Sequence, residues 1–289
     1  MKFYRSVAEG EPILVVRTTD TAYDLTSAKA SLRSFIDLAR AAHITDRTVD
    51  EITERLVSRA TEMAFDPTTD PISQPVVPSE VWAAGVTYQI SEEAREAEST
   101  MPDMYREVYS NERPEVFFKA TSSRTVGPGE DVGIRADSEW DVPEPELGVV
   151  LYRGDPVGYT IGNDMSSRSI EGENPLYLPQ AKIYDRCCSI GPCVTSPVGI
   201  EDPHDLDISM RIHRDGEVVF EGSTSTREMA ETCETLASYY TRHNAVPELA
   251  VLLTGTAIVP DDDFTLRSDD DVEIDVENIG TLENGVREV

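Results

Sequence analysis

The stretch 139–168 constrains the fold of this chain most, because prolines, glycines and short apolar runs in it fix an extended backbone that doubles back. Pro143 and Pro145 alternate there with two glutamates. Glu144 precedes Pro145, and a residue before proline is driven toward extended dihedral angles. Side chains two positions apart on an extended chain point to the same face. Glu144 and Glu146 are therefore predicted to lie side by side.

A hairpin is predicted directly after these glutamates. Apolar runs at 147–151 and 157–161 flank a turn at Gly154-Asp155, and the second run leads to Asp164. Three carboxylates brought together repel one another unless a proton or a cation neutralises them. An all-oxygen set without a nearby His or Cys favours a hard divalent ion, so we expect Mg²⁺, with Mn²⁺ as the alternative.

The competing interpretation is a solvated face of a strand, which is common for paired glutamates in so acidic a chain. The two prolines, the apolar hairpin and the polar corner at 162–168 favour the metal site in combination.

Motifs from about residue 80 to the C-terminus resemble those of the fumarylacetoacetate hydrolase family. They comprise Gly85-Val86-Thr87-Tyr88, Phe118-Lys119, the Glu144/Glu146 pair, Asn163-Asp164-Met165-Ser166-Ser167-Arg168, Lys182 ahead of Gly191-Pro192, Thr254-Gly255-Thr256 and Ile279-Gly280-Thr281-Leu282. The segment Glu173–Gln180 is similar to the branch of 2-keto-3-deoxy-pentonate dehydratases, which act on arabinonate or xylonate derivatives.

The resemblance implies an α+β fold, with a mixed β-sandwich or β-roll catalytic domain over residues 80–289. Residues 1–75 are predicted to form a small α/β domain with an opening hairpin and helical periodicity at 32–42 and 49–65. The proline-rich segment 66–79 is interpreted as a linker, and the alternative is a loop on one continuous domain.

The activity implied is the metal-dependent dehydration of a 2-keto-3-deoxy-pentonate to 2-oxoglutarate semialdehyde in oxidative pentose degradation, the work of a hydro-lyase. The alternatives are an acylpyruvate hydrolase or an oxaloacetate decarboxylase of the same family, and a sugar-acid binding protein without catalysis. Family members that hydrolyse carbon–carbon bonds commonly carry a water-activating histidine shortly after the tyrosine. Here Gln89, Ile90 and Ser91 follow Tyr88, which favours an elimination over hydrolysis.

The candidate catalytic residues are Lys182 and Glu115. The chain has only four lysines, yet Lys119 and Lys182 both lie in motifs. Lys182 is the first candidate for the base that takes a C3 proton, because burial or a nearby cation would favour its neutral form. Glu115 is the alternative base, or the acid that protonates the leaving hydroxyl. The residues expected to bind substrate are Tyr88, Lys119, Arg168, Gln180 and Thr256, although a plain salt bridge is an alternative for Lys119.

The charge of the chain limits its partners. A formal net charge of −30 would repel nucleic acid and anionic membranes, and it is typical of adaptation to molar salt. No signal peptide and no membrane-spanning run is recognised, so a cytoplasmic protein with reduced, buried cysteines is expected. The family resemblance implies a homodimer or a larger homo-oligomer with a small-molecule substrate.

The segment 91–109 is predicted to be a helix, either a lid or a plain surface helix.

Overall fold

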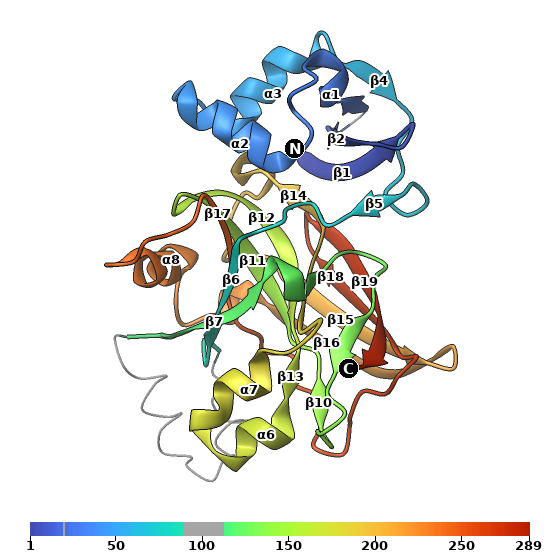
Figure 1. The fold of residues 1–289 in the computed structure, drawn as a ribbon, viewed down its shortest axis with the longest axis vertical. Helices are drawn as coiled ribbons and strands as arrows, with labels where there is room; N and C mark the ends of the chain where they lie inside the picture. The colour runs from blue at the N-terminus through green and yellow to red at the C-terminus, as the bar shows by residue number, and fades with distance from the viewer. Residues whose placement is uncertain (20, 89–112) are drawn as a thin grey trace.

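The computed structural model describes residues 1–19, 21–88 and 113–289, and the helix predicted at 91–109 lies outside this part of the chain. The described fold is mixed α+β, as expected from the sequence. Two large sheets dominate it, one of twelve strands and one of five, and a two-stranded pair lies beside them. Figure 1 shows the first elements of the chain gathered at one end of the molecule, above the remaining strands.

The N-terminal elements form one edge of the twelve-stranded sheet. They are β1 (Lys2–Ala8), β2 (Glu11–Arg17), β3 (Ala22–Asp24), α1 (Leu25–Ala28), α2 (Phe35–Ile44), α3 (Val49–Val57), β4 (Thr61–Met63) and β5 (Ile72–Ser73). Strand β1 pairs with β14 (Cys188–Thr195), so the sheet runs without a break into the rest of the fold. The separation of the chain into domains at 66–79 stays a prediction.

The helix predicted at 49–65 is shorter in the structure. It begins at Val49, directly after the N-cap residue Thr48, which forms a capping box with Glu51, and it ends at Val57. Thr61–Met63 instead pairs with β3 as strand β4. Backbone pairing with a neighbouring strand therefore overrides the helical spacing of the apolar residues at the end of this segment.

The centre of the large sheet carries the predicted hairpin. Its remaining strands are β6 (Glu80–Gly85), β7 (Glu115–Thr121), β8 (Thr125–Val126), β11 (Pro145–Tyr152), β12 (Asp155–Asp164) and β17 (Leu249–Leu253). Strands β11 and β12 are joined by a tight turn in which Arg153 and Gly154 both have positive φ angles, the geometry of a type I′ hairpin turn. All eight residues of β11 are buried, so this hairpin is part of the core.

The five-stranded sheet packs beside it, in the order β16-β15-β18-β19-β9. Its strands are β9 (Val132–Ile134), β15 (Asp207–Arg214), β16 (Glu217–Ser225), β18 (Asp271–Val276) and β19 (Gly280–Glu288). The short pair is β10 (Asp141–Val142) with β13 (Ser166–Ser167). The remaining helices are α6 (Arg168–Glu173), α7 (Leu178–Lys182) and α8 (Cys233–Thr241), and the 3-10 turns are η1 (Ser122–Arg124), η2 (Pro175–Tyr177), η3 (Pro197–Gly199) and η4 (Thr226–Glu228).

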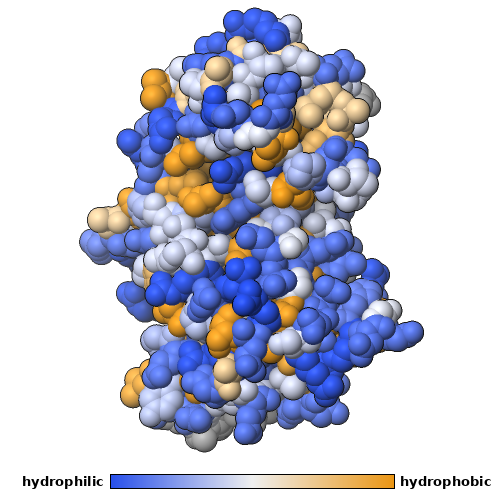
Figure 2. Space-filling view, turned by 45° about the vertical axis from the view of Figure 1, so that its right-hand side comes forward, coloured by the Kyte–Doolittle hydropathy of each residue, from blue (hydrophilic) through white to orange (hydrophobic). Residues whose placement is uncertain are grey.

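The structure has a largely hydrophilic face and buried cysteines. Figure 2 shows hydrophilic residues over most of the face in view, with hydrophobic residues in scattered patches between them. All four cysteines are free and buried, as predicted. Among the described residues, no helix is both long enough and apolar enough to cross a membrane.

The buried carboxyl group of Asp141 is predicted to destabilise the folded protein when it is ionised. Its side chain is buried, and burial raises the pKa of the carboxyl from its ordinary value to about 6. Because the folded state binds this proton more tightly than the unfolded state, the ionised carboxyl destabilises the fold increasingly as pH rises from about 4 to 6. Asp141→Asn should therefore increase the free energy of unfolding by about 1 to 3 kcal/mol at pH 8 and by much less near pH 4. Chemical denaturation at the two pH values measures this, and an equal effect at both would contradict it.

Candidate active site

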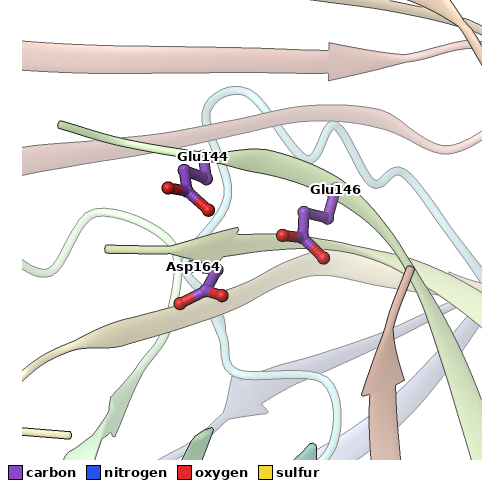
Figure 3. A group of neighbouring side chains, drawn as sticks. All are labelled: Glu144, Glu146 and Asp164. Carbon is purple, nitrogen blue, oxygen red and sulfur yellow. The ribbon is translucent and has the colours of Figure 1, made fainter. Parts of the chain in front are cut away.

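The β11–β12 hairpin places three carboxylates on one face. Glu144 lies just before β11 and accepts a backbone hydrogen bond from the N–H of Asp164, 2.9 Å away, at the end of β12. Glu146 lies two residues further along β11, opposite Gly162. In Figure 3 the three side chains come from adjacent strands and approach one another. One oxygen from each lies within 4.8 Å of the others, so the arrangement predicted from the proline and hairpin pattern is present.

Burial makes this cluster costly without a neutralising partner. Glu144, Glu146 and Asp164 are 3%, 1% and 1% exposed. Burial together with the charges of Asp164 and Glu144 raises the pKa of Glu146 well above its ordinary value. Glu146 Oε2 accepts a hydrogen bond from the backbone N–H of Gly255 at 2.5 Å.

Three cationic side chains surround the other two carboxylates. Lys182 Nζ lies 2.7 Å from Glu144 Oε2 and 3.3 Å from Asp164 Oδ2. Arg168 Nη2 lies 3.1 Å from Glu144 Oε1, and Lys119 Nζ lies 2.6 Å from Asp164 Oδ1. Within the described residues Glu146 has no cationic side chain at ion-pair distance. Glu146 is thus the least compensated of the three charges.

Lys119 lies beside the site but is not among the residues that line its cavity. Its ammonium is 0% exposed, pairs with Asp164, and donates hydrogen bonds to the carbonyl of Met165 at 2.7 Å and the carbonyl of Lys182 at 2.5 Å. The ion pair matches the salt-bridge alternative, and a contact between Lys119 and substrate stays a prediction.

A narrow cavity of about 20 Å³ lies in front of the carboxylates. Its lining combines charged groups with a few apolar side chains: Ala84, Gly85, Val86, Glu115, Phe117, Glu144, Glu146, Asp164, Arg168, Glu171, Leu178, Lys182, Gly255 and Thr256. Lys182, Glu115, Arg168 and Thr256 all line this cavity, and their catalytic and substrate-binding roles stay predictions.

Gln180 does not reach the cavity. It was expected to bind substrate together with Lys182, but it is exposed and only its backbone carbonyl is engaged, with Arg135. The structure folds Leu178–Lys182 into helix α7. Positions two apart on a helix point in different directions. Lys182 is buried for this reason while Gln180 faces solvent.

Tyr88 lies close to the site without lining the cavity. Its ring is fully buried, and its hydroxyl has no hydrogen-bond partner among the described residues. Burial, and then the charge of Glu146, raises the pKa of this hydroxyl. Contact between Tyr88 and substrate stays a prediction.

Glu171 is a lining residue that the motifs did not single out. It is 5% exposed, and it follows Arg168 by three residues on α6. Residues three apart on a helix share a face, so Glu171 lies beside Arg168 because this segment is helical, which the sequence motifs did not predict.

The close approach of Gly85 to Glu115 yields a second prediction. A Cβ atom at residue 85 would overlap the carboxylate of Glu115, which is a movable side-chain end. Gly85→Ala should therefore displace Glu115 and lower kcat/KM at least about 10-fold, with little change in thermal stability. The double variant Gly85→Ala/Glu115→Gln should be no worse than Glu115→Gln, because both changes act on one group. Additive losses in steady-state kinetics would contradict this.

The donor set fits a hard divalent cation. Among the described residues, five carboxylates line the cavity, and three cationic side chains lie at ion-pair distance from Glu144 and Asp164. Three carboxylates with no nitrogen or sulfur ligand suit Mg²⁺ or Mn²⁺ better than zinc.

Comparisons with known proteins identify a family model and relatives that match this chain. The family model for the C-terminal part of fumarylacetoacetate (FAA) hydrolase matches residues 80–287. A probable 2-keto-3-deoxyxylonate dehydratase of Haloferax volcanii is 59% identical over 290 residues, covering 100% of both chains. A 2-dehydro-3-deoxy-D-arabinonate dehydratase of Saccharolobus solfataricus is 47% identical over 216 residues, covering 73% of this chain and 72% of that protein.

Solved structures give the same result. A 2-keto-3-deoxy-D-arabinonate dehydratase complexed with magnesium and 2,5-dioxopentanoate is similar with a TM-score of 0.83 and 38% identity, covering 100% of this chain and 99% of that one. The chain therefore belongs to the fumarylacetoacetate hydrolase family, and within it resembles the 2-keto-3-deoxy-pentonate dehydratases, which are hydro-lyases.

Proposed function

We propose that this protein removes water from a 2-keto-3-deoxy-pentonate of the xylonate or arabinonate series and forms 2-oxoglutarate semialdehyde. The observation that carries the proposal is the buried group of Glu144, Glu146 and Asp164 facing the cavity. It is supported by the similar dehydratase structure, since 2,5-dioxopentanoate is another name for 2-oxoglutarate semialdehyde.

Magnesium is the proposed cofactor, with Mn²⁺ as the alternative, and the three carboxylates would hold it. When bound, such an ion withdraws electrons from a 2-oxo acid and makes its C3 protons more acidic.

Lys182 is proposed to remove the C3 proton. Its Nζ lies within 3.3 Å of two of the three carboxylates, and its side chain is 1% exposed. The amine can take a proton only in its neutral form.

Glu115 is proposed to protonate the leaving hydroxyl. Its side chain lines the same cavity from strand β7. The C4–O bond then breaks, water leaves, and a double bond forms between C3 and C4. Loss of a proton from C5 and return of a proton to C3 move this double bond to C4–C5, and the resulting enol takes a proton at C4 to become the aldehyde at C5. Arg168 and Thr256, both lining residues, would orient the substrate.

Product analysis tests the activity. The protein is incubated with Mg²⁺ in high salt with 2-keto-3-deoxyxylonate, 2-keto-3-deoxyarabinonate, acetylpyruvate and oxaloacetate, and the products are identified by NMR. Formation of 2-oxoglutarate semialdehyde from one or both pentonates is expected. Its absence with both, or faster turnover of acetylpyruvate or oxaloacetate, would replace dehydration by one of the alternative activities.

The proposed setting is a salt-adapted cytoplasmic homodimer or larger homo-oligomer in oxidative pentose degradation. The net charge of −30 supports the salt adaptation, because screening weakens the repulsion among surface carboxylates. Sedimentation and activity measured from low to molar KCl test the assembly and the salt dependence together.

A further inference from the structure

A second cavity lies beside the N-terminus, where strands β1 and β2 meet β14 and the turn between β18 and β19. The N-terminus is marked in Figure 1. The volume of this cavity is about 530 Å³, and its lining residues are Met1, Lys2, Arg17, Thr18, Thr19, Thr195, Gly199 and Asn278. None of them lines the cavity in front of the three carboxylates, so the two cavities are separate places in the fold.

The lining of this second cavity is cationic, although the chain as a whole is strongly acidic. The formal net charge is −30, and five carboxylates line the cavity of the candidate active site. Among the described residues, the lining of the second cavity contains the basic side chains of Lys2 and Arg17 and no carboxylate. Such a cavity attracts anions, which the rest of an acidic surface repels.

Lys2 and Arg17 lie directly opposite each other in the antiparallel pair of β1 and β2. Their Cβ atoms are then about 5 Å apart, and like charges at such positions destabilise a sheet. Within the part of the chain that the structure describes, neither side chain has a carboxylate at ion-pair distance. The Tyr4 hydroxyl interacts with Arg17, but burial raises the pKa of this hydroxyl, so it supplies no negative charge. An anion held between the two cations would remove their repulsion.

Neutral hydrogen-bond donors complete the lining. Thr19 carries a hydroxyl and Asn278 a side-chain amide, and neither group is hydrogen-bonded to another described residue. The N-terminal ammonium of Met1 is already engaged, since it donates to Ser196 Oγ at 3.0 Å and lies 3.9 Å from Asp50 Oδ1. The available set is therefore one guanidinium, one ammonium and two neutral donors.

This set of donors matches a phosphate group. The planar guanidinium can donate two parallel hydrogen bonds to phosphate oxygens, and an ammonium contributes a point charge. A phosphate monoester carries a charge of about −1.5 to −2 at pH 7, which balances two cations, whereas a carboxylate brings a single charge.

We propose that this cavity binds the phosphate group of a small molecule, with Lys2 and Arg17 as its cationic ligands and Thr19 and Asn278 as neutral donors. The volume of about 530 Å³ leaves room for a small organic part beyond the phosphate. The proposal does not depend on the dehydration proposed above, because the two cavities share no residue.

Titration with inorganic phosphate tests the site. The full chain is kept in EDTA at one fixed KCl concentration, and binding is followed by calorimetry and by the line width of the phosphate signal in phosphorus NMR. The parent should bind saturably. Lys2→Gln/Arg17→Gln should bind at least about 10-fold more weakly, because two charge-assisted interactions are lost. Arg17→Gln alone, at an exposed position, should lose at least about 3-fold and keeps the test available if the double variant does not fold.

The matched control is Lys29→Gln/Arg59→Gln. It also removes one lysine and one arginine from the N-terminal elements, at exposed positions that do not line the second cavity. Its affinity for phosphate should stay within about 2-fold of the parent value, because isolated surface charges contribute little.

Thermal unfolding gives a second measurement. In phosphate-free buffer Lys2→Gln/Arg17→Gln should have a Tm at least as high as that of the control, because the repulsion between the opposed cations is gone. Added phosphate should then raise the Tm of the parent and the control by more than that of the Lys2/Arg17 variant. The general stabilising effect of phosphate on folded proteins acts on all three and cancels in this comparison.

Further ligands define the chemical class. Acetate should bind at least about 10-fold more weakly than phosphate, and equal binding would overturn a phosphate site. Tighter binding of glycerol 3-phosphate than of inorganic phosphate would support the site and identify an ester as its ligand, and the reverse order would support it with inorganic phosphate as the ligand.

Two results would overturn the proposal outright. One is the absence of saturable phosphate binding by the parent, and the other is equal affinity in the Lys2/Arg17 variant and the Lys29/Arg59 control. Neither result changes the product analysis, so failure of this site and failure of the proposed dehydration can be told apart.

Discussion

Replacing Lys182 with arginine is expected to lower kcat by about 10²- to 10⁴-fold, the usual contribution of a general base. Arginine keeps the positive charge beside Glu144 and Asp164, 2.7 and 3.3 Å from the lysine nitrogen, so the buried ion pairs are largely retained. It cannot give up its proton in a protein, and so it cannot act as the base. The loss should therefore appear in the chemistry while folding and metal binding survive.

Exchange of the C3 protons of substrate with D₂O, followed by NMR, reports on the base directly. Lys182→Arg should abolish this exchange together with turnover. Lys182→Ala is a less clean variant, because it leaves two buried carboxylates without their shared cation and should destabilise the metal-free protein by about 3 to 5 kcal/mol. If Lys182→Arg exchanged C3 protons at the parent rate, the proton would have to be taken by another group, with Glu115 the first candidate.

Glu146→Gln is expected to weaken Mg²⁺ binding at least about 100-fold and to lower kcat/KM about 10³-fold or more, because one of three anionic ligands is lost. Glutamine has nearly the same shape and can still accept the hydrogen bond from Gly255, so the backbone arrangement should persist.

The sign of the stability change distinguishes a metal ligand from a structural residue. When a chelator keeps the protein free of metal, Glu146→Gln should be at least as stable as the parent, because the substitution removes a buried charge that Glu144 and Asp164 repel. In excess Mg²⁺ the parent should become the more stable of the two, because ligand binding stabilises only the protein that binds. Thermal unfolding of both proteins under both conditions measures this reversal. Equal stabilisation of parent and variant by Mg²⁺ would mean that Glu146 is not a ligand.

The local part of the site follows from the sequence. Prolines force an extended backbone, alternation puts Glu144 and Glu146 on one face, and a glycine turn returns the chain so that Asp164 meets them. These are short-range steric effects, and they require knowledge only of neighbouring residues. The hairpin and the carboxylate cluster could be predicted for that reason.

Other elements depend on partners far along the chain. Thr61–Met63 has helical spacing but becomes a strand, because an edge of the sheet is available to pair with it. Two short helices form between residues 168 and 182, and they turn Gln180 outward and bring Glu171 inward. The spacing of apolar residues along the sequence does not predict these conformations, because each depends on the surface against which the segment packs.

The sequence by itself determined the family, from motifs spread between residues 85 and 282. It also determined the hairpin and the identity of the three carboxylates, because these are encoded in the single stretch 139–168. Only the tertiary structure decided how their charge is balanced. It brings Lys119 from β7 and Lys182 from α7 to Asp164, and it leaves Glu146 without a cationic side chain among the described residues. The physical reason is that burial and Coulomb energy depend on distances in space, which folding sets and spacing along the chain does not.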